Sequence, residues 1–188
     1  MDALAHCLEA YCSPFFHPLS QGIAIEGISI IHKYLLTAFS DGNNIEARGN
    51  MLASSSMGST AFQKGLGAIH SLSHPVGAIY NTHHGLTNAV FMPYVLIKNK
   101  DAIENRIESL ARYINLPDPN FDGFIKWILD LRNKLAVPHT LKELIKDDEK
   151  FEEMSVMAFN DPSTGGNPIQ LTDKDFLQLY RDAYNGKL

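Results

Sequence analysis

Aspartate and histidine side chains recur in this sequence at a spacing that would let them share a cation. Asp2 and His6 are four residues apart, and His70 and His74 repeat that spacing. On an α-helix, side chains four residues apart project from one face, so each pair can close on a common ion. One carboxylate with several neutral imidazoles suits a divalent first-row metal, namely Fe(II), Zn(II), Mn(II) or Ni(II), rather than Ca²⁺ or Mg²⁺.

Spacing alone leaves the ligand assignment open. His83 and His84 follow the second pair closely, and the pattern does not decide which of the four histidines in residues 70–84 face the ion. A single Asp and His four apart on a helix are more often a solvated pair than a metal site. The remaining histidines, taken singly, are expected to be structural or exposed: His17, His32 and His139.

Motifs for several competing chemistries are absent. The chain has no H-E-x-x-H run, no His followed directly by Asp, no G-x-x-x-x-G-K loop and no G-x-S-x-G elbow. These absences disfavour a zinc metalloprotease, a His-Asp phosphohydrolase, a phosphate-binding loop and a serine hydrolase. Cys7 and Cys12 are the only cysteines, too few for a disulfide framework or a four-thiolate zinc site, and are expected to be free thiols.

Apolar periodicity indicates that helices carry these side chains. Apolar residues recur at helical spacings in three segments, residues 18–39, 103–114 and 121–135. Residues 51–61 are rich in small side chains, which suits a closely packed helix, and Thr172 with Asp175 resembles a capping box ahead of a last helix. Strand signals are scarce, so the expected fold class is all-α, with residues 1–188 as one multi-helix domain.

Two glycine-containing runs allow alternative interpretations. Gly65-Leu66-Gly67, just before His70, is either a close-approach turn or a plain helix start. The run from Asp161 to Pro168 is either an ordinary connection or the border of an active site, and its composition favours the connection.

Composition and charge disfavour two classes of partner, nucleic acids and membranes. The chain has 16 Lys and Arg against 21 Asp and Glu, a formal net charge of −5, so no cationic stripe is available for nucleic acid. No apolar run approaches the roughly eighteen residues of a membrane span, and no secretory leader is present, so a cytoplasmic protein without a membrane partner is expected. Residues 1–11 form a predicted helix without a capping lead-in, which suggests a piece of a longer polypeptide.

Four motifs taken together closely resemble the iron-containing (group III) alcohol dehydrogenases. They are Met1-Asp2-Ala3-Leu4-Ala5-His6 with Glu9-Ala10-Tyr11, Gly65-Leu66-Gly67-Ala68-Ile69-His70-Ser71-Leu72-Ser73-His74-Pro75, His84-Gly85-Leu86-Thr87-Asn88-Ala89 and Thr164-Gly165-Gly166-Asn167-Pro168. Their order and separations agree across essentially the whole chain. The resemblance is to the all-helical, metal-carrying C-terminal half of that family, whose fold is shared with dehydroquinate synthase. The α/β half that binds NAD(P) in family members has no counterpart in the 188 residues.

The resemblance implies roles for individual residues. By the family's pattern, four side chains would hold the ion: Asp2, His6, His70 and His84. His74 matches a histidine beside the metal, near the nicotinamide, that is implicated in catalysis or proton transfer. His83 falls at a position with no ligand role, and Asn167 would border the cleft and contact the cofactor.

The resemblance also implies an activity. The family oxidises a small alcohol or reduces an aldehyde, with the divalent metal, Fe²⁺ first and Zn²⁺, Mn²⁺ or Ni²⁺ next, as Lewis acid and NAD or NADP as hydride carrier. Residues 1–188 by themselves are expected to be inactive and to form a homo-oligomer. One alternative is a non-enzymatic helical remnant that self-associates through an apolar face. Another is a relative of glycerol dehydrogenase, which ligates its metal differently.

Overall fold

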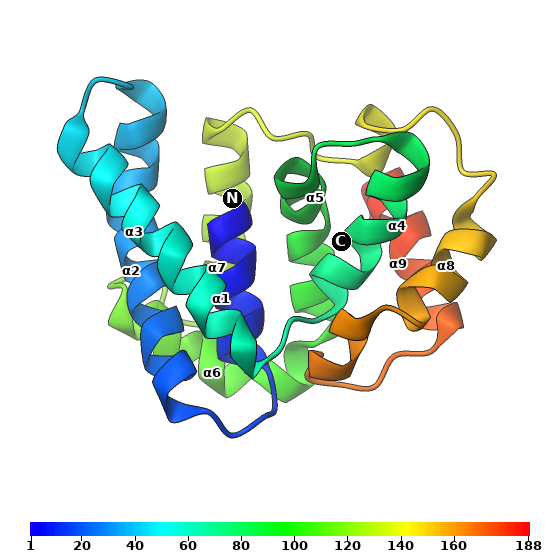
Figure 1. The fold of residues 1–188 in the computed structure, drawn as a ribbon, viewed down its shortest axis with the longest axis horizontal. Coiled ribbons are helices and arrows are strands. Elements are labelled where there is room, and N and C mark those ends of the chain that lie inside the picture. Colours follow the sequence, from blue (N-terminus) through cyan, green and yellow to red (C-terminus); the bar gives the residue numbers. More distant parts are fainter.

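Nine α-helices and three short 3₁₀ turns make up the structure, a computed structural model that describes residues 1–188 (Figure 1). The helices are α1 (Asp2–Cys12), α2 (Pro18–Ser40), α3 (Ile45–Ala61), α4 (Ala68–Tyr80), α5 (His84–Lys98), α6 (Lys100–Tyr113), α7 (Phe121–Lys134), α8 (Phe151–Phe159) and α9 (Asp173–Asn185). The 3₁₀ turns are η1 (Phe62–Lys64), η2 (Leu141–Glu143) and η3 (Pro162–Gly166). No strand is present, and the prediction of an all-α fold is confirmed.

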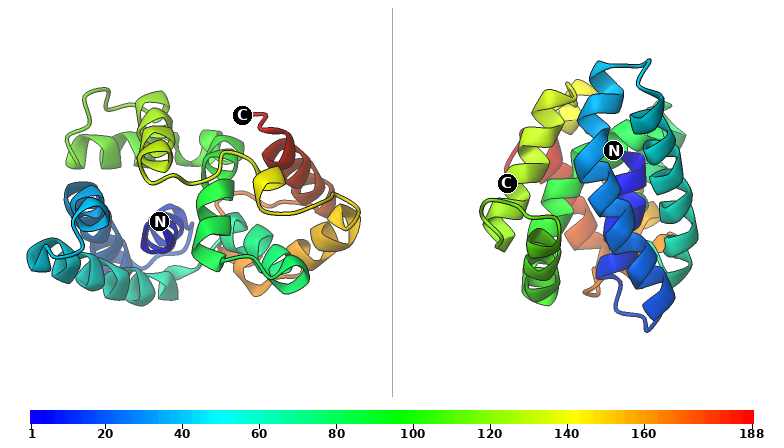
Figure 2. Two further views of the ribbon diagram at one scale, coloured as in Figure 1. Left: turned by 90° about the horizontal axis from the view of Figure 1, so that it is seen from above. Right: turned by 90° about the vertical axis from the view of Figure 1, so that its left-hand side faces the viewer.

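Helix α1 occupies the middle of the arrangement. It packs against α2 and α3 on one side and against α5 on the other, and α4, α8 and α9 lie beyond α5 (Figures 1 and 2). A continuous cluster of 45 buried apolar residues runs through these layers. Leu4 of α1, Phe91 of α5 and Tyr180 of α9 all belong to it and are fully buried. Helix α1 is therefore packed against neighbours on two sides.

The predicted helical segments agree closely with the observed ones. The segment 18–39 corresponds to α2, and 121–135 to α7, whose cap residue Asn120 accepts a hydrogen bond from the amide of Gly123. The predicted capping box is confirmed, because Thr172 and Asp175 each accept from the other's backbone amide. Helix α3 begins earlier than its small-residue run indicates, since Asn44 caps it.

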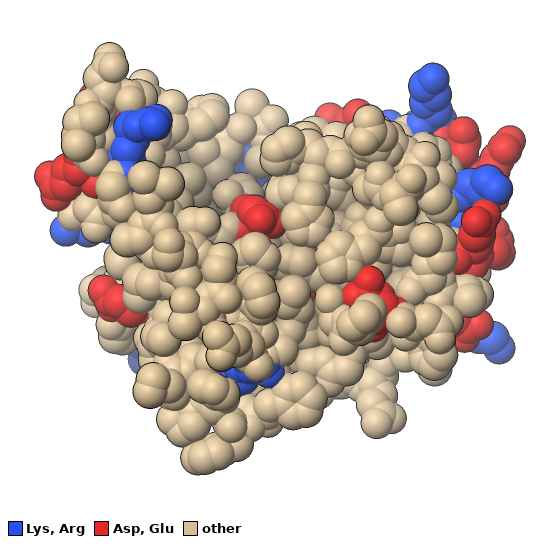
Figure 3. All heavy atoms as spheres, viewed as in Figure 1, with Lys and Arg blue, Asp and Glu red and all other residues tan.

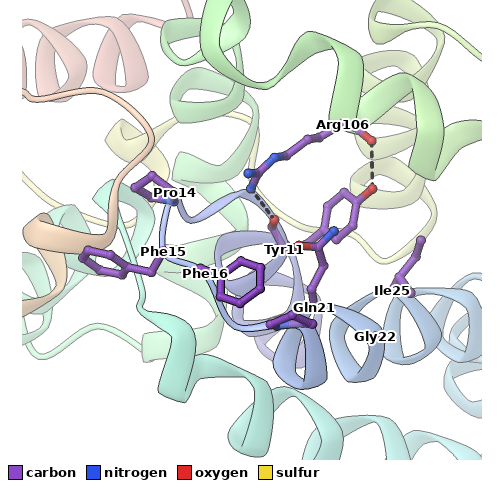
Figure 4. Close-up of a pocket in the computed structure, with 9 residues that line it drawn as sticks. Tyr11, Pro14, Phe15, Phe16, Gln21, Gly22, Ile25 and Arg106 are labelled. Carbon is purple, nitrogen blue, oxygen red and sulfur yellow. Dashed lines mark hydrogen bonds between the residues drawn. The ribbon is translucent and has the colours of Figure 1, made fainter.

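The C-terminal end of α1 is held by two cations from other elements. Nη1 of the Arg106 guanidinium, from α6, lies 3.0, 3.2 and 2.7 Å from the carbonyl oxygens of Tyr11, Cys12 and Ser13. Figure 4 shows its hydrogen bond to Tyr11. The buried ammonium of Lys64 donates to the carbonyl of Tyr11 at 3.2 Å. Burial, with Arg106 as the second cause, lowers the pKa of Lys64 to about 8. Positive charge at a helix C-terminus is favourable, so these contacts stabilise the helix that carries Asp2 and His6.

Several large apolar side chains on and beside α2 and α3 face outward. Phe16 is 94% exposed and Ile45 is 78% exposed. Helix α2 is the one helix long and apolar enough to cross a membrane by length and composition alone, a test that the core helix of a soluble protein also passes. On the face in Figure 3, Lys and Arg lie mainly toward the margins and most of the surface is uncharged. A homo-oligomer and the absence of nucleic-acid and membrane partners stay predictions.

Candidate metal centre

Asp2, His70 and His84 meet at one point where three helices begin. One ligand atom from each residue lies within 4.8 Å of the other two. Asp2 is the first residue of α1, His84 is the first of α5, and His70 lies in the first turn of α4. Residues far apart in the sequence thus supply one carboxylate and two imidazoles, a donor set that suits a divalent first-row metal.

The surroundings of this cluster shift the pKa values of its members in different directions, favouring an ionised Asp2 and a neutral His84. Burial tends to raise the pKa of Asp2, but the hydrogen bond from Asn88 and the nearby histidines outweigh it, and the pKa lies below its ordinary value. Burial lowers the pKa of His6 and of His84. Burial also tends to lower the pKa of His70, but the hydrogen bond and charge of Glu9 outweigh it and raise that pKa. An ionised carboxylate and neutral imidazoles are the ligand forms that a metal requires.

Glu9 orients His70 from behind. Its Oε2 lies 2.5 Å from His70 Nδ1, and its Oε1 accepts a hydrogen bond from the Ile69 amide at 2.7 Å. Glu9 and His70 are both buried, so neither side chain has water as an alternative partner. With Nδ1 donating to the carboxylate, His70 keeps its lone pair on Nε2, the nitrogen that faces the cluster.

Asn88 lies among the three ligand atoms. Its Nδ2 is 2.8 Å from Asp2 Oδ1, 3.2 Å from His70 Nε2 and 3.1 Å from His84 Nε2. An amide nitrogen carries only two hydrogens, so three acceptor atoms converge on a group that can satisfy two of them. Its Oδ1 is buried without a partner. This convergence of lone pairs fits a cation site, with Asn88 able to keep its bond to Asp2 when a metal is bound.

His6 lies beside this cluster. Its ring stacks on that of His70, with centroids 4.8 Å apart, and its Nδ1 is 4.0 Å from Asp2 Oδ2. Phe62 contacts it at a centroid distance of 5.4 Å. Its nitrogens are not part of the mutually close group formed by the other three predicted ligands. The role of His6 as a fourth ligand stays a prediction.

His74 lies next to the ligand histidines. Its ring stacks on that of His84 with centroids 5.4 Å apart, and its Nδ1 is 2.8 Å from Asp161 Oδ2. Burial tends to raise the pKa of Asp161, but hydrogen bonds from His74 and Ser163 outweigh it and lower the pKa. His83, the neighbour of His84, instead caps α5 by accepting the amide of Leu86 at 3.3 Å. The catalytic and cofactor-binding roles predicted for His74 stay predictions.

Asn167 uses its side chain entirely within the protein. Its Oδ1 accepts from the Ala68 amide at 3.2 Å and from Asn99 at 2.9 Å, and its Nδ2 donates to Asn99 and to the Ile169 carbonyl. The side chain therefore fastens the N-terminus of α4 to the start of α6, and no polar atom of it is free for the predicted cofactor contact. That contact stays a prediction.

The two glycines before α4 are needed because of their backbone conformation and because atoms of other segments lie close to their backbone. Gly65 adopts a φ of +121°, which side-chain-bearing residues rarely adopt. A Cβ on Gly67 would lie 3.1 Å from Asn167 Oδ1 and 3.2 Å from Glu9 Oε1. Both alternatives for Gly65-Leu66-Gly67 therefore hold, since this close-approach turn leads directly into the first residue of α4.

Sequence reasoning missed three residues of the centre: Glu9, Asn88 and Asp161. Glu9 lies seven residues after Asp2, two helical turns along, so helical geometry places it on the same face as the predicted ligand. Asn88 lies four residues after His84 and carried the same signal. Asp161 begins the run interpreted as either a connection or the border of an active site, but no local pattern indicated its pairing with His74, 87 residues away.

Replacing Glu9 with glutamine is expected to weaken metal binding about 10- to 100-fold, the usual cost of losing a group that orients a ligand histidine. The amide cannot accept a hydrogen bond through both of its side-chain atoms, so either Ile69 or His70 loses its acceptor. Competition titration with a chromogenic chelator measures the affinity for Zn(II). Glu26→Gln, on the exposed face of α2, is the matched control. Equal affinities in both variants would show that Glu9 does not support the site.

The chain is similar in sequence and in fold to proteins of one known family. The model of the "Fe-containing alcohol dehydrogenase family, C-terminal" matches residues 1–184. The chain is 35% identical to 4-hydroxybutyrate dehydrogenase of Cupriavidus necator and 34% identical to the NAD-dependent methanol dehydrogenase of Bacillus methanolicus, over 97% of its own length in each case. The iron-containing alcohol dehydrogenase from Thermococcus thioreducens superposes with a TM-score of 0.89 at 31% identity, covering 98% of this chain and 49% of that one. The chain spans about half the length, 50%, of both curated relatives.

Proposed function

Because the chain belongs to the Fe-containing alcohol dehydrogenase family, we propose that residues 1–188 form the metal-holding domain of an enzyme that interconverts a small alcohol and an aldehyde with NAD or NADP. The observation that carries this proposal is the convergence of Asp2, His70 and His84 on one point. The convergence lies in the part of the chain that matches the family model.

The residues of the centre would have different roles in holding the metal. A bound divalent metal, Fe²⁺ in the first instance and Zn²⁺, Mn²⁺ or Ni²⁺ as alternatives, would supply Lewis acidity that polarises the alcohol or carbonyl oxygen. Glu9 fixes the ring of His70, and Asn88 holds the carboxylate of Asp2, so both ligands are oriented in advance. His6 would complete the ligand set from the adjacent turn of α1.

His74 is proposed to move the proton of the reaction. When an alcohol becomes an aldehyde, the hydride leaves carbon for the oxidised nicotinamide and the hydroxyl proton needs an acceptor. Imidazoles commonly accept and donate protons in catalysis, so Nε2 of His74 can take that proton and return it in the reverse direction. An apolar hollow of about 450 Å³ that opens to solvent lies beside Asp2 and is lined in part by Leu35, Phe39 and Leu86.

The names of the relatives support a small substrate. One relative acts on 4-hydroxybutyrate and the other on methanol with NAD, so we propose a short alcohol or aldehyde for this chain. Because the relatives are about twice as long, we expect residues 1–188 by themselves to bind metal without turning over substrate. A cytoplasmic location and a homo-oligomeric state are proposed with this function.

Metal content is the first test of the proposal. Protein purified without oxygen and offered Fe(II) or Zn(II) at neutral pH is expected to retain about one equivalent by elemental mass spectrometry, as one cluster of three or four ligands requires. A second test replaces the matching half of the Cupriavidus necator relative with residues 1–188. The chimera is expected to oxidise a short alcohol in a metal-dependent manner. A folded chimera that holds metal but transfers no hydride would overturn the proposed activity.

A further inference from the structure

Helix α4 is joined to a distant segment of the chain by three regularly spaced contacts. The amide of Ala68 donates to Asn167 Oδ1 at 3.2 Å, and the hydroxyl of Thr164 donates to that of Ser71 at 2.8 Å. His74 Nδ1 and Asp161 Oδ2 form the third contact, also at 2.8 Å. Each step moves three residues forward along α4 and three residues back along the other segment. We call this arrangement the α4 ladder.

The contact between His74 and Asp161 differs from the other two because His74 lies beside the proposed metal ligands. The side chain of Asp161 is only 13% exposed, and its other oxygen accepts the amide of Ser163 at 2.8 Å, which caps η3. The carboxylate is thus held at both oxygens, and the ladder sets its position relative to α4. His74 is 42% exposed, and its contact with Asp161 is the one hydrogen bond that its ring makes within the protein.

A carboxylate at Nδ1 decides where a neutral imidazole carries its hydrogen. An ionised carboxylate only accepts hydrogen bonds, so Nδ1 must be the donor and Nε2 must carry the lone pair. The ring of His74 stacks on His84 and lies edge-on to His70, with centroids 5.4 and 5.8 Å apart. Nε2 therefore belongs to an imidazole that is packed directly against two proposed metal ligands.

We propose that Asp161 is a positioning residue that holds His74 in the Nδ1–H tautomer, so that Nε2 is the atom that exchanges the hydroxyl proton of the substrate. In alcohol oxidation the O–H bond breaks, the proton passes to Nε2, and the hydride passes from carbon to the oxidised nicotinamide. The resulting imidazolium keeps its Nδ1–H bond to the carboxylate, which stabilises the added charge. The proton's source rests on the proposed function, whereas the tautomer does not.

The tautomer can be measured on residues 1–188 without any activity. Long-range ¹H–¹⁵N correlation spectra at one mildly alkaline pH report which ring nitrogen carries the hydrogen, and His74→Gln identifies the signals. Parent protein and Asp161→Glu are expected to show the Nδ1–H form. Asp161→Asn can donate its amide to Nδ1 and is expected to shift His74 to the Nε2–H form. Thr164→Val removes the neighbouring contact of the ladder and is expected to leave the tautomer unchanged.

The outcomes separate positioning from a merely structural role. An Nδ1–H form that persists in Asp161→Asn, with the other histidine signals unmoved, would overturn the proposal. A shift in Thr164→Val as large as that in Asp161→Asn would also overturn it, because any loosening of the ladder would then suffice.

Activity in the chimera provides the second readout. Asp161→Asn is expected to lower kcat at least about tenfold with little change in KM, and Asp161→Glu to recover part of that loss. If the parent chimera transfers no hydride but the tautomer shifts as expected, the proposed function fails while the positioning role stands. If the tautomer does not shift in an active chimera, the positioning role fails alone.

Discussion

Alanine at position 70 is expected to abolish the binding of one equivalent of Fe(II) or Zn(II) by this chain. His70 is one of three residues whose ligand atoms converge, and it is 1% exposed, so no water or neighbouring side chain can readily replace its nitrogen. Losing only an orienting partner of a ligand costs about 10- to 100-fold in affinity, so the loss of the ligand itself is expected to exceed about 100-fold. Isothermal titration under nitrogen measures the binding.

Three further variants test whether the loss is specific to the proposed ligands. His84→Ala is expected to weaken binding severely, because it removes the second converging imidazole. His139→Ala changes an exposed histidine that bonds to Asn133 and is expected to bind metal as the parent does. His70→Asn keeps a polar group beside Glu9, which guards against loss of binding through unfolding. If His70→Ala and His70→Asn bind metal with parental affinity, the site has been placed wrongly.

Alanine at position 166 is expected to destabilise the protein by about 3 kcal/mol or more, at the upper end of what overpacking costs. A Cβ built on Gly166 would lie 2.0 Å from the carbonyl oxygen of Leu66, and 3.1 Å from the Cα of Gly65. These are backbone atoms, which cannot rotate aside as a flexible side chain can. The segment that carries Asn167 and Asp161 would have to move away from the turn before α4. Urea denaturation monitored by circular dichroism measures the change in the free energy of unfolding.

The neighbouring glycine supplies the control. A Cβ on Gly165 would meet no heavy atom within 4 Å, so Gly165→Ala is expected to change the free energy of unfolding by less than about 0.5 kcal/mol. The two variants differ by one position and add the same methyl group. Equal effects would mean that the close approach of Gly166 to Leu66 does not limit the packing of this segment.

The helices themselves were largely predictable because their signals are local. Apolar side chains at helical spacings located α2, α6 and α7, and the Thr172 and Asp175 pair marked the beginning of α9. These signals depend on neighbours within two turns of the chain. The beginning of α3 was missed because its first residues carry no strong apolar pattern and rely on the cap that Asn44 supplies.

The contacts between helices were not predictable in the same way. Spacing identified Asp2, His70 and His84 as candidates, but only the family resemblance chose among the histidines of residues 70–84. The pairing of His74 with Asp161 depends on how α8 and η3 pack against α4, and no local pattern encodes it. Conversely, Asn167 belongs to a recognisable motif, yet its side chain binds the backbone of α4 and the neighbouring Asn99.

The α4 ladder also affects when the centre is formed as the chain folds. Its contacts join residues 87, 93 and 99 positions apart, so each one closes a long loop. The entropy of closing such loops delays non-local contacts relative to the formation of single helices. During synthesis, the side chains of Asp2, His6, His70 and His84 leave the ribosome well before Asp161 does. We therefore expect the proposed ligands to be available to a metal before Asp161, which is made later, secures the imidazole of His74.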